Sequence, residues 1–269
     1  MSTMKLTYWG VRGSIAVPGQ NTVRYGGNTS CLEVRAGDTR VIIDAGTGIR
    51  GLGSTIKSPE EIYLLFTHLH WDHIQGFPFF TPIYRPDFTI HIYSGHKADV
   101  SLEDVMKGQM QEPNFPVSLG GLPARMTYNE VHKGESIPLP GVLVKTTDLN
   151  HPNDAMGLRF EADGKSLVHI SDHEHTPEHH PRIVEFCRGA DLLSMDTMFT
   201  PGNYEAFRGW GHSHWLHACE IARDAGVKRL VLFHHDPNKT DSDLDAIRDE
   251  AASHFPNTVV AFEGLCIDL

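Results

Sequence analysis

Ligand-type side chains are concentrated in one short stretch, Thr67-His68-Leu69-His70-Trp71-Asp72-His73. Imidazole and carboxylate groups bind divalent transition metals, and this stretch has no lysine or arginine to pair with its aspartate. In an extended segment His68 and His70 point to the same side. Asp72 and His73 are adjacent, can begin a helix and can diverge toward a second point. Metal binding therefore outweighs the alternative of surface histidines, and one loop could serve two metal ions.

An apolar run positions this loop. Residues 62–66 precede it directly and have the length and composition of a buried strand. Open α/β sheets place their chemistry at the carboxyl ends of strands, so these side chains should leave the sheet edge together. Three more candidate ligands follow other expected strands: His151, Asp172 and either His234 or His235. Together they complete a set for two metals.

The hydrophobic pattern predicts a strand-rich first half, a few helices and a second half of strands and helices. A strand followed by a Gly-rich turn is expected within residues 6–16. Further strands are expected at residues 31–34, 40–43, 62–66, 89–93, 125–131, 142–148, 156–161, 166–170, 191–195, 230–233, 258–262 and 265–267. Helices are expected at 102–110, 181–188 and 215–225, with Ser213 as the last one's N-cap, and in a final helix capped by Ser242. This order suits two sheets packed together and flanked by helices.

Composition limits the function classes. With 40% apolar and 21% charged residues, the chain is typical of a globular protein, and we expect one domain over residues 1–269. The formal net charge of −11 disfavours an extended nucleic-acid footprint, because phosphate binding normally needs clustered Lys and Arg. The first residues lack a signal-peptide pattern, and no apolar stretch approaches the roughly 20 residues of a membrane span. We therefore expect a cytoplasmic protein without a membrane partner.

The ligand pattern resembles the metallo-β-lactamase superfamily, whose fold is a four-layer αβ/βα sandwich with a dinuclear site at the sheet edge. The resemblance covers nearly the whole chain, from Asp44 through Asp236. It implies one metal on His68, His70 and His151, a second on Asp72, His73 and His234, and Asp172 as the bridge. His234 is preferred to His235 because the family's last ligand directly follows the apolar strand. Two divalent ions are the implied cofactors, with zinc first and manganese or iron as alternatives.

A second motif narrows the resemblance. The segment Gly211-His212-Ser213, followed by a helix and the strand before His234, is similar to ribonuclease Z and related phosphodiesterases. In that group such a histidine, paired with an acidic residue on an earlier strand, assists the leaving group. Here Asp196 falls at that strand in place of the usual glutamate, and Met195 replaces the group's second histidine. The alternatives are an exposed loop histidine for His212 and a structural cap for Asp196.

These features predict hydrolysis of a small phosphodiester such as a cyclic nucleotide, by a hydroxide that two metals share. The expected catalytic residues are Asp72, Asp172, His212 and Asp196, with His212 protonating the departing alkoxide. The sequence has no clear counterpart of the RNA-gripping arm of ribonuclease Z-like enzymes, so extended nucleic acid is disfavoured as a partner. The alternatives are a metal-dependent thioesterase or lactonase, an RNA-processing endonuclease and a non-catalytic metal-containing signalling module. A homodimer is compatible with the superfamily.

Other polar residues have two interpretations each. Arg12, Arg24 and Asn28 could contact a phosphate or base, or lie on the surface. Asp44 either supports the metal site or forms a turn. A histidine-rich run lies outside the family's ligand positions and is expected to be a solvated loop rather than a third metal site; it comprises His173, His175, His179 and His180.

Overall fold

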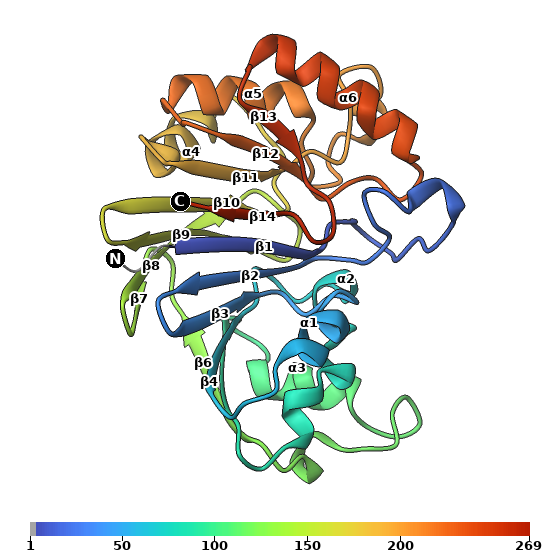
Figure 1. The fold of residues 1–269 in the computed structure, drawn as a ribbon, viewed down its shortest axis with the longest axis vertical. Helices are drawn as coiled ribbons and strands as arrows, with labels where there is room; N and C mark the ends of the chain where they lie inside the picture. The colour runs from blue at the N-terminus through green and yellow to red at the C-terminus, as the bar shows by residue number, and fades with distance from the viewer. Residues whose placement is uncertain (1–3) are drawn as a thin grey trace.

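Two seven-stranded sheets pack face to face in the computed structural model, which describes residues 4–269 (Figure 1). The first sheet has the order β14-β1-β2-β3-β4-β5-β6. Its strands are Met4–Gly10 (β1), Cys31–Ala36 (β2), Thr39–Ile43 (β3), Glu61–Leu65 (β4), Thr89–Gly95 (β5), Arg125–Val131 (β6) and Cys266–Asp268 (β14). The second sheet has the order β13-β12-β11-β10-β9-β8-β7. Its strands are Ser136–Leu139 (β7), Val142–Leu149 (β8), Ala155–Ala162 (β9), Lys165–Ile170 (β10), Leu192–Asp196 (β11), Leu230–Phe233 (β12) and Thr258–Val260 (β13).

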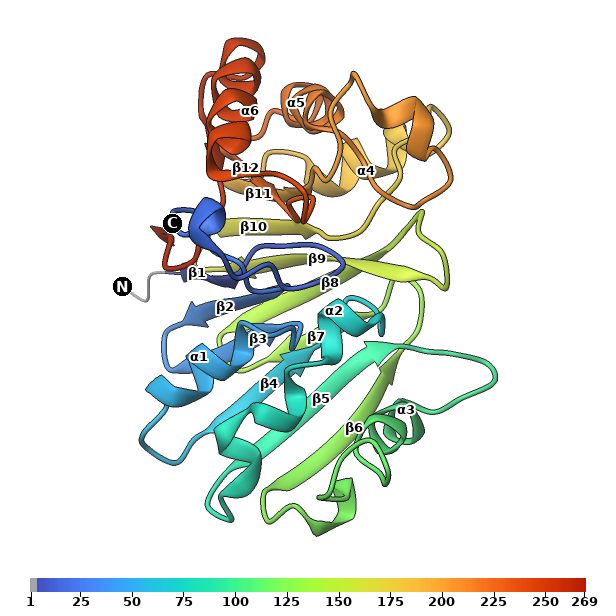
Figure 2. The same cartoon turned by 90° about the vertical axis from the view of Figure 1, so that its right-hand side faces the viewer.

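Helices cover the outer faces of both sheets (Figure 2). The first sheet is covered by Ile49–Thr55 (α1), Trp71–Ile74 (α2) and Leu102–Gln109 (α3), and the second by His180–Cys187 (α4), Trp215–Asp224 (α5) and Asp241–His254 (α6). Short 3-10 turns occur at Gln20–Thr22, Phe77–Phe79, Thr81–Tyr84, Leu119–Gly121 and Tyr204–Phe207. Among residues 4–269, none of the helices combines the length and apolar character that crossing a bilayer requires. The predicted four-layer αβ/βα sandwich is therefore confirmed.

The hydrophobic core forms three layers, one between the sheets and one under each set of helices. In β1 the side chains alternate, and Leu6 and Tyr8 point into the central layer, where the Tyr8 ring lies 5.8 Å from that of Phe233. In β11 and β12 every residue is buried, because both faces of these parallel strands are covered. Continuous burial explains why β12 is an apolar run, whereas β11 also buries the polar Ser194 and Asp196.

Parallel strands bring the candidate ligands to one edge. β3, β4, β5 and β6 run parallel in the first sheet, and β10, β11, β12 and β13 do so in the second. The loop after β4 carries His68, and the loops after β10 and β12 carry Asp172 and His234. β8 has the same direction as β10, because both pair antiparallel with β9, and it delivers His151.

The sequence prediction erred mainly at short elements and helix caps. The strand β7 was missed because it has only four residues and lies next to a glycine turn. Thr240, not Ser242, caps α6, where it forms a capping box with Asp243. His214, not Ser213, caps α5, because the Ser213 hydroxyl binds the neighbouring loop instead.

Candidate metal centre

Three imidazole nitrogens converge at the end of β4 and β8. Nε2 of His68 lies 3.0 Å from Nδ1 of His70, and Nε2 of His151 lies 3.1 Å from the same Nδ1. The rings meet at steep angles rather than stacking, with their nitrogens facing one another. Three nitrogens this close and this oriented match the donor set of a zinc-type ion.

A second group of four side chains lies beside the first: Asp72, His73, Asp172 and His234. Nε2 of His73 is 3.4 Å from Oδ2 of Asp72 and 3.3 Å from Oδ1 of Asp172. Nε2 of His234 is 3.3 Å from each of the same two oxygens. Two imidazoles and two carboxylates thus face a common point, and all four side chains are buried.

Asp172 connects the two groups through its separate oxygens. Its Oδ2 lies 3.6 Å from Nε2 of His68 and 3.7 Å from Nε2 of His151. Its Oδ1 faces the two histidines of the second group. A carboxylate that offers one oxygen to each of two donor groups has the geometry of a bridging ligand.

Asp44 holds His73 from behind. Its Oδ2 lies 2.7 Å from Nδ1 of His73, and its Oδ1 accepts the backbone N–H of Thr67 at 2.8 Å. The other His73 nitrogen, Nε2, is shielded from solvent and has no hydrogen-bond partner within residues 4–269. Asp44 has a φ of 61°, a conformation that Asp tolerates better than most residues. It therefore fixes the His73 ring with one nitrogen aimed at the metal position, as carboxylates behind metal-binding histidines do.

Glu174 holds His151 through an intermediate loop. Nδ1 of His151 donates to the carbonyl of Gly211 at 2.8 Å. The Glu174 carboxylate accepts the backbone N–H groups of Gly209 and Gly211 at 2.8 and 2.9 Å. Gly211 has a φ of 86°, and a Cβ there would lie 2.2 Å from the His151 ring. Sequence reasoning missed Glu174, whose only signal was a carboxylate within the histidine-rich run.

The electrostatics of the two groups differ. Burial lowers the pKa of His68 and of His151, which keeps these imidazoles neutral as metal binding requires. Burial opposes protonation of His234 too, but Asp172, Asp196 and Asp72 outweigh it and raise its pKa to about 10. The buried carboxylates thus stabilise positive charge in the site, and divalent cations would supply that charge.

His212 and Asp196 lie together beside both groups. Nδ1 of His212 is 2.9 Å from Oδ2 of Asp196. The His212 ring lies 5.2 Å from that of His151 and stacks at 5.1 Å on that of His234. Asp196 is completely buried and also accepts the backbone N–H of Met198 at 3.0 Å. Burial favours its neutral form, but the nearby His212 and His234 outweigh this and lower the pKa of Asp196.

Comparison with known families agrees with this geometry. A family model described as a beta-lactamase superfamily domain matches residues 39–235. This chain belongs to the metallo-β-lactamase superfamily. A ribonuclease Z from Archaeoglobus fulgidus is 25% identical over 324 aligned positions, which cover 98% of this chain and 97% of that protein. Since this chain has only 269 residues, the archaeal protein carries segments that it lacks. The superfamily member described here thus lies near the ribonuclease Z branch.

Solved structures show the same fold. The metallo-beta-lactamase fold protein YhfI from Bacillus subtilis superposes with a TM-score of 0.76 at 20% identity, covering 100% of both chains. A diphosphatase from the PhnP family gives a TM-score of 0.73 at 21% identity, covering 99% of this chain and 98% of that one. At these identities the likeness establishes the architecture alone.

His234 and His235, the two candidates for the metal ligand after β12, differ in orientation. Nε2 of His234 faces the Asp72 carboxylate of the second group. Nε2 of His235 instead donates a hydrogen bond to the carbonyl of Ala261 at 2.8 Å. Burial lowers the pKa of His235 to about 3, so it is neutral. His234 is thus the one positioned to bind a metal.

Three side chains of the early loop that could have contacted a phosphate or base bind other parts of the protein instead. Arg12 is completely buried and donates to the carbonyls of Gly26 and Lys239 at 2.8 and 2.7 Å. Arg24 pairs with Asp245 on α6. Asn28 donates from its side chain to Glu263 at 3.0 Å. These three residues therefore fasten the early loop to the carboxyl-terminal part of the chain.

The histidine-rich run after Asp172 is not a solvated loop. His173 and Glu174 are buried, and His175 is half-buried. Nδ1 of His173 accepts the backbone N–H of Asn150 at 3.0 Å. The expectation of a solvated loop was wrong because the glutamate and the imidazoles find partners on segments far away in the sequence.

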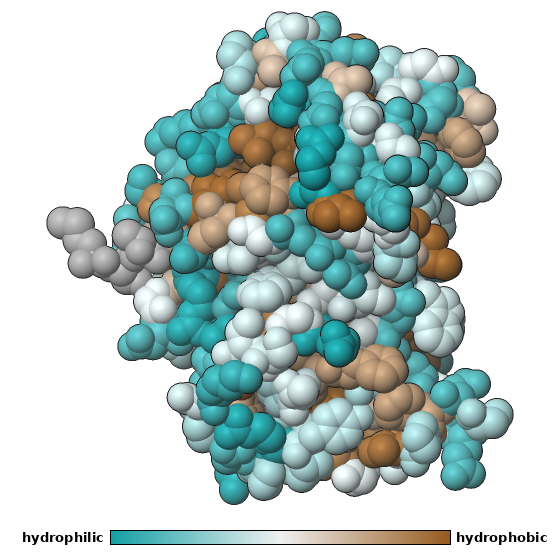
Figure 3. All heavy atoms as spheres, turned by 45° about the vertical axis from the view of Figure 1, so that its right-hand side comes forward, coloured by the Kyte–Doolittle hydropathy of each residue, from teal (hydrophilic) through white to brown (hydrophobic). Residues whose placement is uncertain are grey.

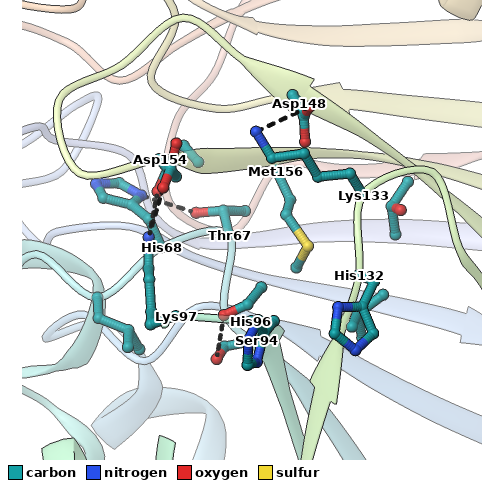
Figure 4. A pocket seen from close by; sticks show the side chains of 15 residues that line it. Thr67, His68, Ser94, His96, Lys97, His132, Lys133, Asp148, Asp154 and Met156 are labelled. Carbon is teal, nitrogen blue, oxygen red and sulfur yellow. Dashed lines mark hydrogen bonds and ion pairs between the residues drawn. The ribbon is translucent and has the colours of Figure 1, made fainter. Parts of the chain in front are cut away.

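Two adjoining hollows open beside the metal centre. One, of about 600 Å³, is lined by His70, Lys97 and Asn153 among others. The other, of about 390 Å³, lies between the sheets, and the Lys133–Asp148 ion pair stands on one side of it (Figure 4). Both share His68 and Lys97 in their linings. Their volumes fall in the range of small-molecule sites.

Proposed function

We propose that this protein is a dinuclear metal-dependent phosphodiesterase that acts on a small phosphodiester such as a cyclic nucleotide. The observation that carries the proposal is the His212–Asp196 pair, 2.9 Å apart and adjacent to both ligand groups. Thioester hydrolysis by such a site needs no added proton donor of this kind, because a thiolate is a good leaving group. An alkoxide leaving a phosphodiester does need one.

The seven proposed ligands fit two divalent ions. They are His68, His70 and His151 for one ion, Asp72, His73 and His234 for the other, and Asp172 between them. Nitrogen-rich donors with carboxylates favour zinc, with manganese or iron as alternatives. Such ions supply Lewis-acid activation of water and of phosphate oxygens.

The remaining residues orient the reaction. Nδ1 of His212 is held by Asp196, which leaves Nε2 as the nitrogen that can donate a proton to the departing oxygen. Asp72 and Asp172 carry the negative charge that fixes the cations, and Asp172 lies between the groups, where it orients the attacking water. General-acid assistance of this type accelerates a reaction by about 10²–10⁴-fold.

Exposed aromatic rings support a substrate that carries a base. Trp71, which stands between His70 and Asp72 in the sequence, is 65% exposed. Trp210, two residues before His212, is 63% exposed. On one face of the molecule, apolar patches are separated by hydrophilic surface (Figure 3). Aromatic side chains stack on bases of any sequence. The hollows beside the centre are of a suitable size for a nucleotide.

RNA cleavage is the second candidate, favoured by the relatives named ribonuclease Z. Two observations support the small substrate instead. The chain is shorter than its alignment with the archaeal ribonuclease Z, and its net charge of −11 opposes a long phosphate backbone.

The test is a substrate panel on purified wild-type protein with zinc, manganese or iron. It contains cyclic nucleotides, bis(p-nitrophenyl) phosphate, a thioester, a lactone and an RNA hairpin with a 3′ extension. We expect the highest kcat/KM on a cyclic nucleotide. Exclusive turnover of the thioester or lactone would reject phosphodiester chemistry, and preferred cleavage of the hairpin would reject the small substrate alone.

A further inference from the structure

A second set of ligand-type side chains lies outside the seven proposed ligands. His175 lies in the loop after β10, and His217 and Glu220 are three positions apart on α5, which places them on one face. One nitrogen or oxygen atom from each residue lies within 4.8 Å of those from the other two. We propose that His175, His217 and Glu220 form a third metal site, separate from the dinuclear centre, that takes a zinc-type divalent ion.

The imidazoles of this site have free nitrogens. Nδ1 of His175 and Nδ1 of His217 are both shielded from solvent, and neither has a hydrogen-bond partner in the part of the chain that the structure describes. The two ring centroids are 4.3 Å apart. A buried polar atom without a partner is costly, whereas a metal ion would use both lone pairs. All three side chains are partly exposed, so an ion can reach them from solvent.

The charges suit a divalent cation. Burial, then the neighbouring His180 and His214, lowers the pKa of His175 to about 4. Burial, then His214 and His175, lowers the pKa of His217 to about 2. Both imidazoles are therefore neutral at pH 7, as ligands must be. Two neutral imidazoles and the Glu220 carboxylate form a donor set that zinc accepts with its fourth position open.

The side chains must close slightly around the ion. A tetrahedral zinc ion with bonds of about 2.0–2.1 Å holds its ligand atoms about 3.4 Å apart. The atoms here lie within 4.8 Å, so rotation of the side chains brings them to that spacing. By contrast, in the dinuclear centre Nδ1 of His70 already lies 3.0 Å from Nε2 of His68 and 3.1 Å from Nε2 of His151.

An ion at this site would fasten two segments of the dinuclear centre to each other. His175 follows Asp172 by three residues, and α5 begins three residues after His212. Ser213 already links these segments, because its Oγ donates to the carbonyl of His173 at 2.5 Å and accepts the N–H of His175 at 3.2 Å. The third site is thus a positioning element for the loop that supplies Asp172.

The number of zinc ions per chain tests the proposal. The full-length wild type and its variants are saturated with zinc, freed of excess metal by gel filtration and measured by elemental analysis. We expect His217→Gln and Glu220→Gln each to hold one ion fewer than the wild type. A matched control, His91→Gln on β5, removes an imidazole outside the cluster and should hold as many ions as the wild type.

Equal zinc content in the wild type and both cluster variants would overturn the proposal. If His217→Gln does not fold, Glu220→Gln decides, because its side chain is partly exposed and keeps its size. A zinc-edge anomalous difference map locates the ion: a peak between His175 and His217 at a loading of three zinc ions per chain supports the site, whereas a peak present only in excess zinc identifies an adventitious ion only. The zinc count does not depend on which substrate the protein cleaves.

Discussion

The two histidine clusters of this protein differ in how their imidazoles are held. In the dinuclear centre, two imidazoles have a hydrogen-bond partner at the nitrogen that faces away from the metal position: His73 has Asp44, and His151 has the carbonyl of Gly211. In the cluster on α5, His175 and His217 keep buried Nδ1 atoms without any partner among residues 4–269. Hydrogen bonds thus fix the His73 and His151 rings before a ligand arrives, whereas no such bond to Nδ1 fixes the rings of His175 and His217. Preorganised groups suit chemistry.

Removal of His212 should have the largest effect on catalysis. We expect His212→Ala to lower kcat about 10²–10⁴-fold for a cyclic nucleotide, whose alkoxide needs a proton. The loss should be smaller for bis(p-nitrophenyl) phosphate, because nitrophenolate leaves without one. Steady-state kinetics on both substrates, with zinc content measured in parallel, gives the comparison. An equal loss on both substrates would show that His212 is not the acid.

The hydrogen bond between Asp44 and His73 should strengthen metal binding. We expect Asp44→Asn to weaken metal binding about 10–100-fold, as loss of a carboxylate behind a histidine ligand does. Asn tolerates the same backbone conformation, so the change tests the charge rather than the fold. Competition with a chelator measures the affinity. Asp245→Asn, which removes a carboxylate that pairs with Arg24, is the control and should bind metal normally.

The fold was largely readable from the sequence, because its elements depend on local pattern. The strands Arg125–Val131 and Leu230–Phe233 have their predicted bounds, since an apolar or alternating run ends at a clear turn in each case. The cap of α6 was misplaced because Thr240, Asp241 and Ser242 are all suitable residue types, and only the reciprocal bonds to Asp243 select one.

The partners behind the site could not be predicted, because they depend on distant contacts. Asp44 reaches His73 only since β3 and β4 are parallel neighbours. Arginine is usually exposed at the surface. Here the burial of Arg12 depends on hydrogen bonds to the carbonyls of Gly26 and Lys239, which lie far apart in the sequence. The proximity of His175 to His217, separated by 42 positions, depends on how α5 packs beside β11.

The exposed tryptophans should affect substrate binding modestly. We expect Trp71→Ala to raise KM for a cyclic nucleotide about fivefold or more, since stacking on a base contributes at least about 1 kcal/mol. A phosphodiester without an aromatic group should bind unchanged, and kcat should vary little. Phe262→Ala removes another exposed ring, 38% exposed, from a segment outside the site and serves as the control. Equal changes for both substrates would rule out stacking.

The smallest effect should appear in the acid stability of the metal-free protein. The pKa of His217 is about 2 when folded, far below the value of about 6.5 expected in the unfolded chain. Between these values the unfolded state binds more protons, so stability falls as pH drops below about 6.5. His217→Gln removes this contribution to the pH dependence. The unfolding free energy of the variant should therefore fall less steeply between pH 7.5 and 5 than that of the wild type. The difference in slope corresponds to at most about one proton taken up on unfolding. Urea titrations across that range, with chelator present and His91→Gln as control, measure the slopes. Parallel slopes for His217→Gln and the wild type would mean that His217 is protonated in the folded protein, and the contrast between the two clusters would then fail.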